Sequence, residues 1–425
     1  MTLGCKVNKY ESEAVEELLK EAGYQIVPFT DYADVYIINT CTVTAMSAKK
    51  SRQMIRRTKR INPNSVVAVM GCYSQKSPEE VLAIDEVNVV FGTSRRESLI
   101  LELENLSPDD KKILVDDIMK IRNFEEMTIT QVSDRTRALI KIQDGCDRFC
   151  SYCIIPYTRG PVRSRSLSNI IRETKRLAEN GYKEVVLTGI HVASYGKDNG
   201  SNLAEVITEI AKIDGIKRIR TSSVEPIIIT KDFMDKVSQV EAFCPHFHLS
   251  MQSGSDGVLK RMNRRYNARE YKEAVELIRQ YYPDASITTD VIVGFPGEST
   301  EEFEETRALL EKIRLYETHI FKYSEREGTK AAQLKDDVTQ EEKSRRSDIL
   351  IQLSKENMNH HQRNVLGTEL EVLFESVDKN YYYGHTKNYV KVAVPNREDK
   401  LINQIVKVKA GEIEDDFVVG EIVEN

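Results

Sequence analysis

The chain of 425 residues lacks any apolar run long enough to cross a bilayer, and its start lacks the basic-then-apolar pattern of a secretion signal. We therefore expect a cytoplasmic protein that does not bind a membrane. An excess of positive charge is also missing, because the formal net charge is −6. Any nucleic-acid contact must then come from local basic patches. The length exceeds one ordinary core and predicts two or three domains.

Cysteine is scarce, and its odd count of seven, without a secretion signal, argues against a disulfide framework and for metal or redox chemistry in a reducing compartment. Three of these cysteines, Cys146, Cys150 and Cys153, lie within eight residues. Thiolates at this spacing can hold three irons of a four-iron cluster, which normally takes four cysteine ligands. His191 is the only further Cys or His in the next ninety residues. One iron would therefore stay open to a substrate.

This triplet of cysteines has two possible functions. An open iron beside a reducible cluster is what one-electron cleavage of S-adenosylmethionine requires. The alternative is a structural zinc site in an RNA-binding protein without catalysis. Zinc sites usually pair two C-x2-C halves to close four ligands, and this spacing fits that pattern poorly. We therefore favour the iron–sulfur cluster.

A second set of cysteines, Cys5, Cys41 and Cys72, is scattered in the sequence but shares a context. Cys41 and Cys72 each follow a short apolar run, and Cys5 opens the chain. Cysteines at the carboxyl ends of neighbouring parallel strands can converge on one sheet edge. They either hold a second cluster or are three separately buried thiols, and the triplet further on favours the cluster. Cys244 and the alternating pair of His246 and His248 have simpler interpretations, as core and structural residues.

The pattern of the first region predicts a small α/β domain. Short apolar runs at 35–39 and 66–70 are typical of buried parallel strands, and helical stretches follow near 43–60 and 95–105. We assign this domain to residues 1–110 and a linker to 111–134.

The next region, 135–362, repeats a strand–helix unit six times, which predicts a partial (βα)6 barrel with its site at the carboxyl ends of the strands. The expected strands are 138–143, 184–188, 217–222, 246–251, 287–292 and 317–322. After a charged helix near 339–362, short β-like runs predict a small antiparallel barrel at 363–425. Those runs are 369–374, 389–394, 404–409 and 418–423.

Several stretches together carry a resemblance to a known family. They are 2–8 (TLGCKVN), 39–44 (NTCTVT), 71–72 (GC), 144–156 (DGCDRFCSYCIIP), 159–165 (RGPVRSR), 252–256 (QSGSD) and 290–298 (DVIVGFPGE). Over essentially the whole chain, they resemble the radical S-adenosylmethionine methylthiotransferases, and the last barrel is similar to the RNA-binding TRAM domain. Family members usually carry a full first strand before the residue matching Cys5, so we expect a misassigned or trimmed start here.

The family has three branches, and residues 3–8 and 40–44 look most like one of them. That branch converts N6-threonylcarbamoyladenosine next to the tRNA anticodon, at position 37, to its 2-methylthio derivative. The alternatives are methylthiolation of isopentenyladenosine in tRNA or of an aspartate in a ribosomal protein.

The resemblance also implies the cofactors and partners. S-adenosylmethionine on the open iron of the Cys146, Cys150 and Cys153 cluster would yield a 5′-deoxyadenosyl radical that removes hydrogen from adenine C2. A second 4Fe-4S cluster on Cys5, Cys41 and Cys72 would hold the sulfur, which a second S-adenosylmethionine would methylate. Partners would be the tRNA anticodon stem-loop, an electron donor such as flavodoxin or ferredoxin, and a sulfur donor. No residue stands out as a general acid or base.

Candidate cofactor contacts are residues beside the triplet or at predicted strand ends, although each is also a common turn or packing residue. They are Tyr152, Gly189, Ser223, Gln252 and Asp290. Candidate RNA contacts come from three places: seven cations within 49–60, three arginines after the triplet, and mixed aromatics and cations in the last barrel. They are Arg52, Arg56, Arg159, Arg163, Arg165, Tyr382, Lys387 and Lys391. From residue 364 onward seven Lys/Arg face twelve Asp/Glu, so RNA contact there must be confined to one face.

Overall fold

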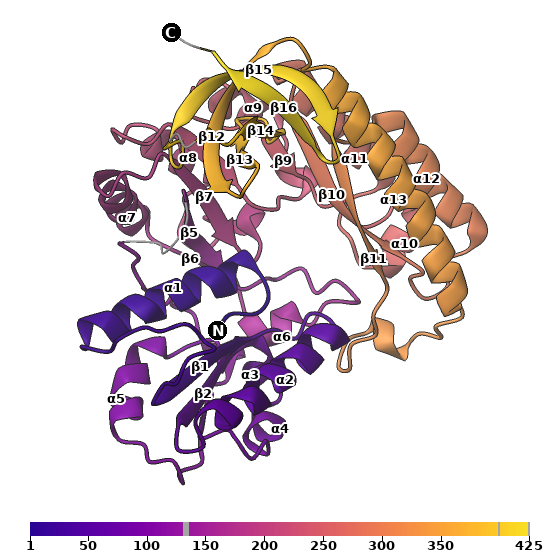
Figure 1. Ribbon diagram of the computed structural model, residues 1–425. Coiled ribbons are helices and arrows are strands. Elements are labelled where there is room, and N and C mark those ends of the chain that lie inside the picture. Colours follow the sequence, from indigo (N-terminus) through magenta and orange to yellow (C-terminus); the bar gives the residue numbers. More distant parts are fainter. Residues whose placement is uncertain (131–135, 398–399, 424–425) are drawn as a thin grey trace.

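The computed structural model describes residues 1–130, 136–397 and 400–423. Figure 1 shows three parts: an N-terminal α/β domain, a curved strand–helix core, and a small β-barrel at the C-terminal end. No helix in these ranges is both long and apolar enough to cross a membrane.

The N-terminal domain is a four-stranded parallel sheet in the order β1-β2-β3-β4. Strand β2 is buried along its whole length, as its continuous apolar run predicts. The elements are α1 (Lys6–Glu21), β1 (Val35–Thr40), α2 (Ala45–Ile61), β2 (Val66–Gly71), α3 (Cys72–Lys76), α4 (Pro78–Leu82), β3 (Val89–Phe91), η1 (Arg96–Ser98), α5 (Leu99–Glu104), β4 (Lys112–Leu114) and η2 (Ile118–Lys120).

The sheet runs past the expected boundary at residue 110. Strand β4 pairs with β3 in parallel, with Val89 opposite Lys112. It is a three-residue edge strand whose side chains are mostly exposed. The apolar stretch there is limited to residues 113–115 between charged residues, which is too short to indicate a strand, so the sequence predicts a linker in its place.

The core contains the six predicted parallel strands. Strands β5, β7 and β8 form one sheet with the short antiparallel β6, strands β9, β10 and β11 form another, and single bridges from Ile219 to Phe243 and from Val224 to Leu249 link the two. The strands are β5 (Arg137–Asp144), β6 (Arg163–Ser164), β7 (Glu184–Gly189), β8 (Arg218–Thr221), β9 (His246–His248), β10 (Ser286–Val293) and β11 (Glu317–Lys322). The partial barrel and the α/β class are as predicted.

Helices cover the outside of this barrel, and local capping explains where several begin and end. At α12, the Ser299 hydroxyl accepts from the Glu302 N–H, and the Glu302 carboxylate accepts from the Ser299 N–H, which is the predicted capping box. Helix α7 ends before Gly181, whose φ of +85° suits a left-handed cap. The core helices are α6 (Ile155–Arg159), α7 (Leu167–Glu179), η3 (Val192–Ser194), α8 (Leu203–Ile210), η4 (Pro226–Ile228), α9 (Lys231–Val237), α10 (Asp256–Arg261), α11 (Ala268–Tyr281), α12 (Thr300–Ile313) and η5 (Ala331–Gln333).

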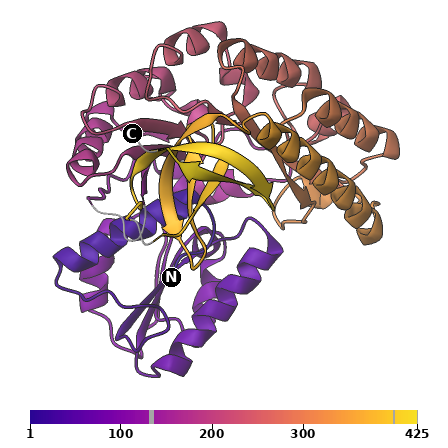
Figure 2. The ribbon, with the colours of Figure 1, turned by 45° about the horizontal axis from the view of Figure 1, so that its top comes forward.

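Helix α13 (Gln340–Arg363) leads to a closed barrel with the strand order β12-β13-β14-β16-β15. Its strands are β12 (Glu369–Val377), β13 (Tyr381–Thr386), β14 (Lys391–Pro395), β15 (Ile405–Glu414) and β16 (Phe417–Ile422). Four of the five match the predicted runs, whereas β13 reads in the sequence as a mixture of aromatics and cations. In Figure 2 this barrel lies over the junction between the core and the N-terminal domain.

The barrel is held to the amino-terminal end of the core strands by buried arginines. Arg218 donates to the carbonyl oxygens of His385 and Glu371, each at 2.8 Å, and Arg220 donates to that of Lys387 at 3.0 Å. The barrel thus closes one end of the core while the carboxyl ends of the strands remain open toward the N-terminal domain.

Candidate metal-cluster and cofactor site

The first three thiols lie on the loop between β5 and α6, at the carboxyl end of the first core strand. The N–H of Cys146 donates to the carbonyl of Gly160 at 3.0 Å, and that of Cys153 donates to the carbonyl of Cys150 at 2.9 Å. Gly145 begins this loop with a φ of +73°, and a Cβ there would lie 1.8 Å from the carbonyl oxygen of Pro161. Only glycine lets the loop pass so close to the next segment.

These thiols are poor metal ligands until a metal displaces their protons. Burial raises the pKa of Cys146 to about 11 and that of Cys153 to about 12. Arg264 Nη1 lies 3.1 Å from the sulfur of Cys150 and supplies a positive charge beside it. A metal is ligated by the thiolate form of cysteine.

The three thiols of this loop do not all lie as close together as the ligands of a single ion. Among the described residues, one group of three potential metal-ligand side chains has its ligand atoms within 4.8 Å of one another. It consists of His248, Asp290 and His319 and contains no cysteine. One zinc ion needs its ligands that close, whereas the cysteines of a four-iron cluster bind different irons and stand farther apart. The donor set therefore fits a 4Fe-4S cluster.

Glu225 is the acid on which the cations around this loop converge. Its carboxylate lies 2.8 Å from Arg148, 2.9 Å from Arg264 and 3.1 Å from Nε2 of His191. Burial alone would raise the pKa of Glu225, but His191 and the two guanidinium groups overcome it and lower the pKa to about 2. Sequence reasoning missed Glu225 and Arg264. Glu225 comes shortly after β8, where a charged residue is a weak signal, whereas Arg264 follows helix α10 and carries no such signal.

The second three thiols lie at adjacent strand ends of the N-terminal sheet. Cys41 follows β1 and Cys72 follows β2, where Thr40 pairs with Gly71. Cys5 follows a segment bridged to β1 through Thr2 and Asn39. Gly4 has a φ of +104°, and a Cβ added there would lie 3.1 Å from the sulfur of Cys41. The glycine before Cys5 therefore lets this part of the chain pass close to Cys41.

The surroundings of this second set also combine burial with one cation. Burial raises the pKa of both Cys41 and Cys72. The Nε of Arg159 lies 3.3 Å from the sulfur of Cys72. In both sets, therefore, an arginine N–H contacts the sulfur of one buried cysteine.

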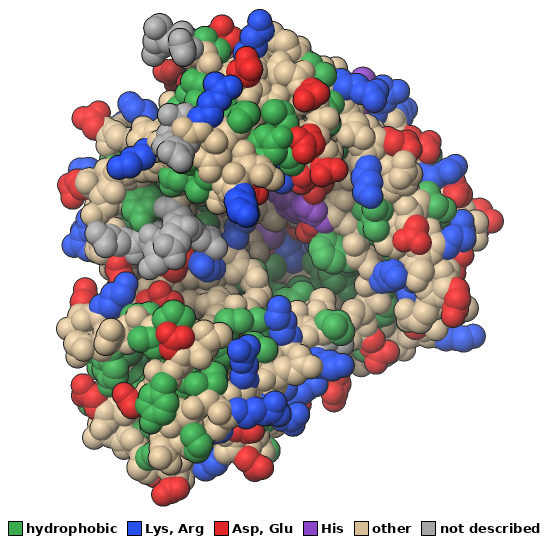
Figure 3. All heavy atoms as spheres, viewed as in Figure 1, with side chains coloured by type: hydrophobic (Ala, Val, Ile, Leu, Met, Phe, Trp, Pro, Cys, Tyr) green, Lys and Arg blue, Asp and Glu red, His purple; other side chains and the backbone are tan. Residues whose placement is uncertain are grey.

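The three thiols of the first set and Cys5 of the second set line one cavity of about 610 Å³. It opens into the hollow that Figure 3 shows between the N-terminal domain and the C-terminal barrel. The hydroxyl of Ser222 in this wall is buried and has no hydrogen-bond partner among the described residues, so a bound polar molecule can satisfy it.

Four of the five candidate cofactor residues line this cavity: Tyr152, Gly189, Ser223 and Asp290. Gln252 does not. Its φ is +66°, its N–H donates to the carbonyl of Asp290 at 2.8 Å, and its role in the structure is to join the chain to β10.

The three arginines after the first loop are buried inside the protein, which corrects their assignment as RNA contacts. Arg159 donates to Asn8 and Glu11, Arg163 donates to the carbonyl of Arg159, and Arg165 forms an ion pair with Glu173. All three are at most 3% exposed, so RNA cannot reach them. The sequence gives no local sign that Arg159 is buried, because its partner Glu11 lies 148 residues away, whereas Glu173 lies 8 residues after Arg165.

Glu11 is the centre of the charge cluster that joins the N-terminal domain to the core. Its carboxylate lies 2.9 Å from Arg96 and 2.7 Å from Lys141, in addition to its contact with Arg159. Burial would raise its pKa, but Arg159, Arg96 and Lys141 lower the pKa to about 2. The three opposite charges keep this buried acid ionised.

The remaining RNA candidates fall into two groups. Arg56 is exposed on α2, and Arg52 is half-buried, with its guanidinium 3.2 Å from the hydroxyl of Tyr73. In the last barrel, Tyr382 points into the core, because alternate residues of β13 are buried. Tyr382 therefore cannot stack on an RNA base, which corrects its assignment as an RNA contact. The half-buried Tyr381 and Tyr383 lie on the outer face.

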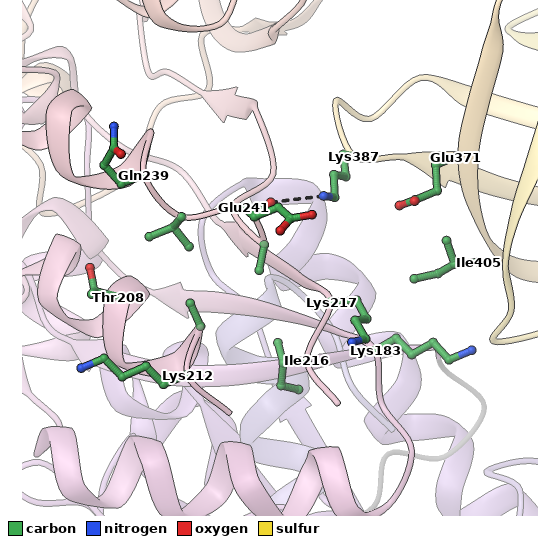
Figure 4. Close-up of a pocket in the computed structure, with 13 residues that line it drawn as sticks. Lys183, Thr208, Lys212, Ile216, Lys217, Gln239, Glu241, Glu371, Lys387 and Ile405 are labelled. Carbon is green, nitrogen blue, oxygen red and sulfur yellow. Dashed lines mark hydrogen bonds between the residues drawn. The ribbon is translucent and has the colours of Figure 1, made fainter. Parts of the chain in front are cut away.

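The two barrel lysines already have partners. Lys391 forms an ion pair with Asp416 at 3.0 Å. Lys387 donates to the carbonyl of Glu241 at 3.2 Å across a groove of about 720 Å³ between the core and the barrel (Figure 4). Lys387 thus helps to dock the barrel.

The two histidines of β9 differ in their surroundings. His246 is buried and stacks on Tyr389, whereas His248 lies 3.2 Å from Asp290 and stacks on His319. The structure therefore gives His248 two neighbours that the sequence does not reveal, because Asp290 and His319 come from the next two strands.

A cysteine-rich loop after the first strand of a partial barrel, with its cavity at the carboxyl ends of the strands, defines the radical S-adenosylmethionine class of enzymes. A family model described as Radical SAM superfamily matches residues 140–310, and one described as Uncharacterized protein family UPF0004 matches residues 1–92. The class implies a 4Fe-4S cluster and S-adenosylmethionine as cofactors.

Relatives that match nearly the whole chain identify its family within this class. The chain is 44% identical over 416 residues to threonylcarbamoyladenosine tRNA methylthiotransferase MtaB of Bacillus subtilis, covering 96% of this chain and 92% of that protein. It is 40% identical to the protein of the same name from Aquifex aeolicus, with coverages of 96% and 98%. A tRNA-2-methylthio-N(6)-dimethylallyladenosine synthase of Acetivibrio thermocellus is 36% identical, with coverages of 99% and 90%. The chain therefore belongs to the methylthiotransferase family of radical S-adenosylmethionine enzymes.

Among solved structures, the fold is similar to that of the radical S-adenosylmethionine methyltransferase TsrM from Kitasatospora setae, with a TM-score of 0.53. The two are 15% identical, and the match covers 73% of this chain and 71% of that one. At this identity the likeness supports the fold alone.

Proposed function

We propose that the protein replaces the C2 hydrogen of N6-threonylcarbamoyladenosine in tRNA, at position 37 next to the anticodon, by a methylthio group. The names of the relatives at 44% and 40% identity suggest this substrate. The observation that carries the chemistry is the cavity of about 610 Å³ lined by the three thiols of the first set and by Cys5 of the second set. One base in that cavity can meet both centres.

Two 4Fe-4S clusters, one on Cys146, Cys150 and Cys153 and one on Cys5, Cys41 and Cys72, together with S-adenosylmethionine, supply the radical chemistry, the sulfur and the methyl group when bound. The chain itself positions these groups. Glu225 fixes Arg264 against Cys150, and Arg159 is held against Cys72 by Glu11.

Binding of the tRNA is assigned to the rim of the hollow. Helix α2 carries exposed Arg56 and neighbouring cations directly after Cys41, and a helix of this charge suits the phosphates of an anticodon stem-loop. An electron donor such as flavodoxin or ferredoxin and a separate sulfur donor complete the reaction. A tRNA substrate also fits the cytoplasmic location expected from the sequence.

The test is mass spectrometry of nucleosides. Anaerobically reconstituted protein, a reductant and S-adenosylmethionine are incubated with tRNA from cells that lack this gene. The expected result is a mass gain of one methylthio group on threonylcarbamoyladenosine. A gain on dimethylallyladenosine instead would move the protein to the other tRNA branch, and a gain on neither would refute the tRNA assignment.

A further inference from the structure

A second cavity, of about 330 Å³, lies between the core and the C-terminal barrel. Its walls include three cations from three different elements, Lys6 on α1, Arg137 on β5 and Arg220 on β8. Lys6 also lines the thiol cavity, so the two cavities meet at this side chain.

Positive charge is in excess in the second cavity. Arg137 pairs with Glu375 at 2.8 Å, and Arg220 pairs with Glu184 at 2.8 Å. Glu375 is also bound to His385, at 3.0 Å. Lys6 is accessible to solvent, and its ammonium has no hydrogen bond or ion pair within the described part of the chain. The cavity therefore offers one uncompensated cation.

An aromatic stack forms one wall of this cavity. Tyr389 lies between His246 and His385, with ring centroids 4.1 Å and 4.5 Å away, and the guanidinium carbons of Arg220 and Arg137 lie 4.9 Å and 5.5 Å from its ring. Tyr389 has a φ of +72°, which is uncommon for a bulky residue. Strained residues of this kind cluster at ligand sites, because the surrounding structure must hold them there.

The positive charge in this cavity also affects the pKa of His246. Burial, with Arg220 and Lys6 after it, holds the pKa of His246 well below its usual range. The imidazole is therefore neutral and adds aromatic surface without charge. A planar, anionic group is the ligand that this combination of stack and cations suits best.

We propose that this second cavity binds the carboxylate of the threonylcarbamoyl substituent, and that Lys6 determines the choice of substrate. The inference rests on the proposed function. When C2 of an adenine faces the thiol cavity, the N6 substituent leaves the ring from another edge and needs space beyond that cavity. A dimethylallyl substituent has no charge and gains nothing from Lys6. A carboxylate there removes the excess positive charge.

The test pairs changes in the protein with changes in the substrate. Three synthetic anticodon stem-loops carry threonylcarbamoyladenosine, the same group with its carboxylate converted to a methyl amide, or dimethylallyladenosine. The wild type, Lys6→Gln and the control Lys9→Gln are compared by kcat/KM for methylthio product. Lys9 lies on the same helix and pairs with Glu13.

For the wild type we expect the amide to reduce kcat/KM about 10- to 100-fold, which is the usual effect of one charged hydrogen bond. Lys6→Gln should lose a similar factor on the carboxylate substrate and show no further loss on the amide, while Lys9→Gln behaves as the wild type. Equal losses of Lys6→Gln on the carboxylate and amide substrates would overturn the proposal, as would a wild type that does not distinguish them.

Lys6 follows Cys5 in the chain, so iron and sulfide contents are measured for every variant. If Lys6→Gln loses iron, Arg137→Gln, which lies on β5 away from both thiol sets, decides the question by the same comparison. A reduced preference for the carboxylate supports the proposal, and an unchanged preference overturns it. A wild type that modifies only the dimethylallyl stem-loop would instead refute the proposed function.

Discussion

At the residue scale, Glu225 connects the first thiol loop to the wall of the cavity. Its carboxylate holds Arg148, Arg264 and His191 within 3.1 Å, and Arg264 in turn contacts the sulfur of Cys150. Removal of this single negative charge leaves two buried guanidinium groups without their shared partner.

We expect Glu225→Gln to reduce the release of 5′-deoxyadenosine from S-adenosylmethionine about 10- to 100-fold, the usual range for a hydrogen bond to a charged group. The iron content should stay near that of the wild type, because the three thiols remain. Glu209→Gln, which changes a partly exposed acid paired with Lys212, serves as the control. Full activity of Glu225→Gln would contradict this role.

Glu11 makes stability depend on pH in acid. Its pKa falls from 4.5 in the unfolded chain to about 2 in the folded one, so its stabilisation is complete above pH 4.5 and disappears as pH falls toward 2. At 1.36 kcal/mol per pKa unit, this amounts to about 3 kcal/mol. Urea unfolding of the apoprotein between these pH values should show the loss, and Glu11→Gln should unfold more easily at pH 7 and lack this contribution. Identical pH profiles would refute it.

At the element scale, the β5–α6 loop has its shape because of Gly145. We expect Gly145→Ala to lose the first cluster, since its Cβ would lie 1.8 Å from a backbone oxygen. Iron should fall from about eight to about four per chain, as one of two four-iron clusters is lost. Gly181→Ala is the matched control, with a φ of +85° but no atom within 4 Å of the added Cβ. It should cost about 1 kcal/mol and leave iron unchanged.

Helix α2 is the element assigned to tRNA. The double variant Arg56→Glu and Arg57→Glu should weaken tRNA binding and reduce the slope of log affinity against log salt by about 2, one per phosphate contact. Filter binding at several salt concentrations measures both. Lys355→Glu on α13 is the control, an exposed lysine on a helix far along the chain. An unchanged salt slope in the double variant would place the tRNA elsewhere.

Elements with a strong local pattern could be predicted from the sequence, and those without one could not. Six core strands and the Ser299 capping box are encoded by apolar runs and by residues three positions apart. Strand β4 has three mostly exposed residues in an apolar stretch limited to 113–115, and β13 mixes Tyr with Gly and His, so neither carries an apolar run of the usual strand length. The buried state of Arg159 depends on Glu11, 148 residues away, which no local pattern reveals.

At the scale of the whole molecule, the three parts seen in Figure 1 border the hollow that the space-filling view in Figure 3 shows. The buried charges around Glu11 and Arg159 join the N-terminal domain to the core, and Arg218 and Arg220 join the barrel to the core. These two interfaces fix the domains that carry the two thiol sets, and Cys5 of the second set lines the cavity of the first. The sequence predicted both sets of thiols, but only the folded chain shows how Cys5 comes to the cavity of the first set.

The most direct test of this account compares Cys146→Ser and Cys72→Ser with the wild type in one assay that measures 5′-deoxyadenosine and methylthio-nucleoside together. We expect the wild type to form both, Cys146→Ser to form neither, and Cys72→Ser to form 5′-deoxyadenosine without the methylthio product. Such a result would separate a radical-generating centre from a sulfur-supplying centre. Methylthio product from Cys72→Ser at the wild-type rate would contradict the central claim that both thiol sets act on one base.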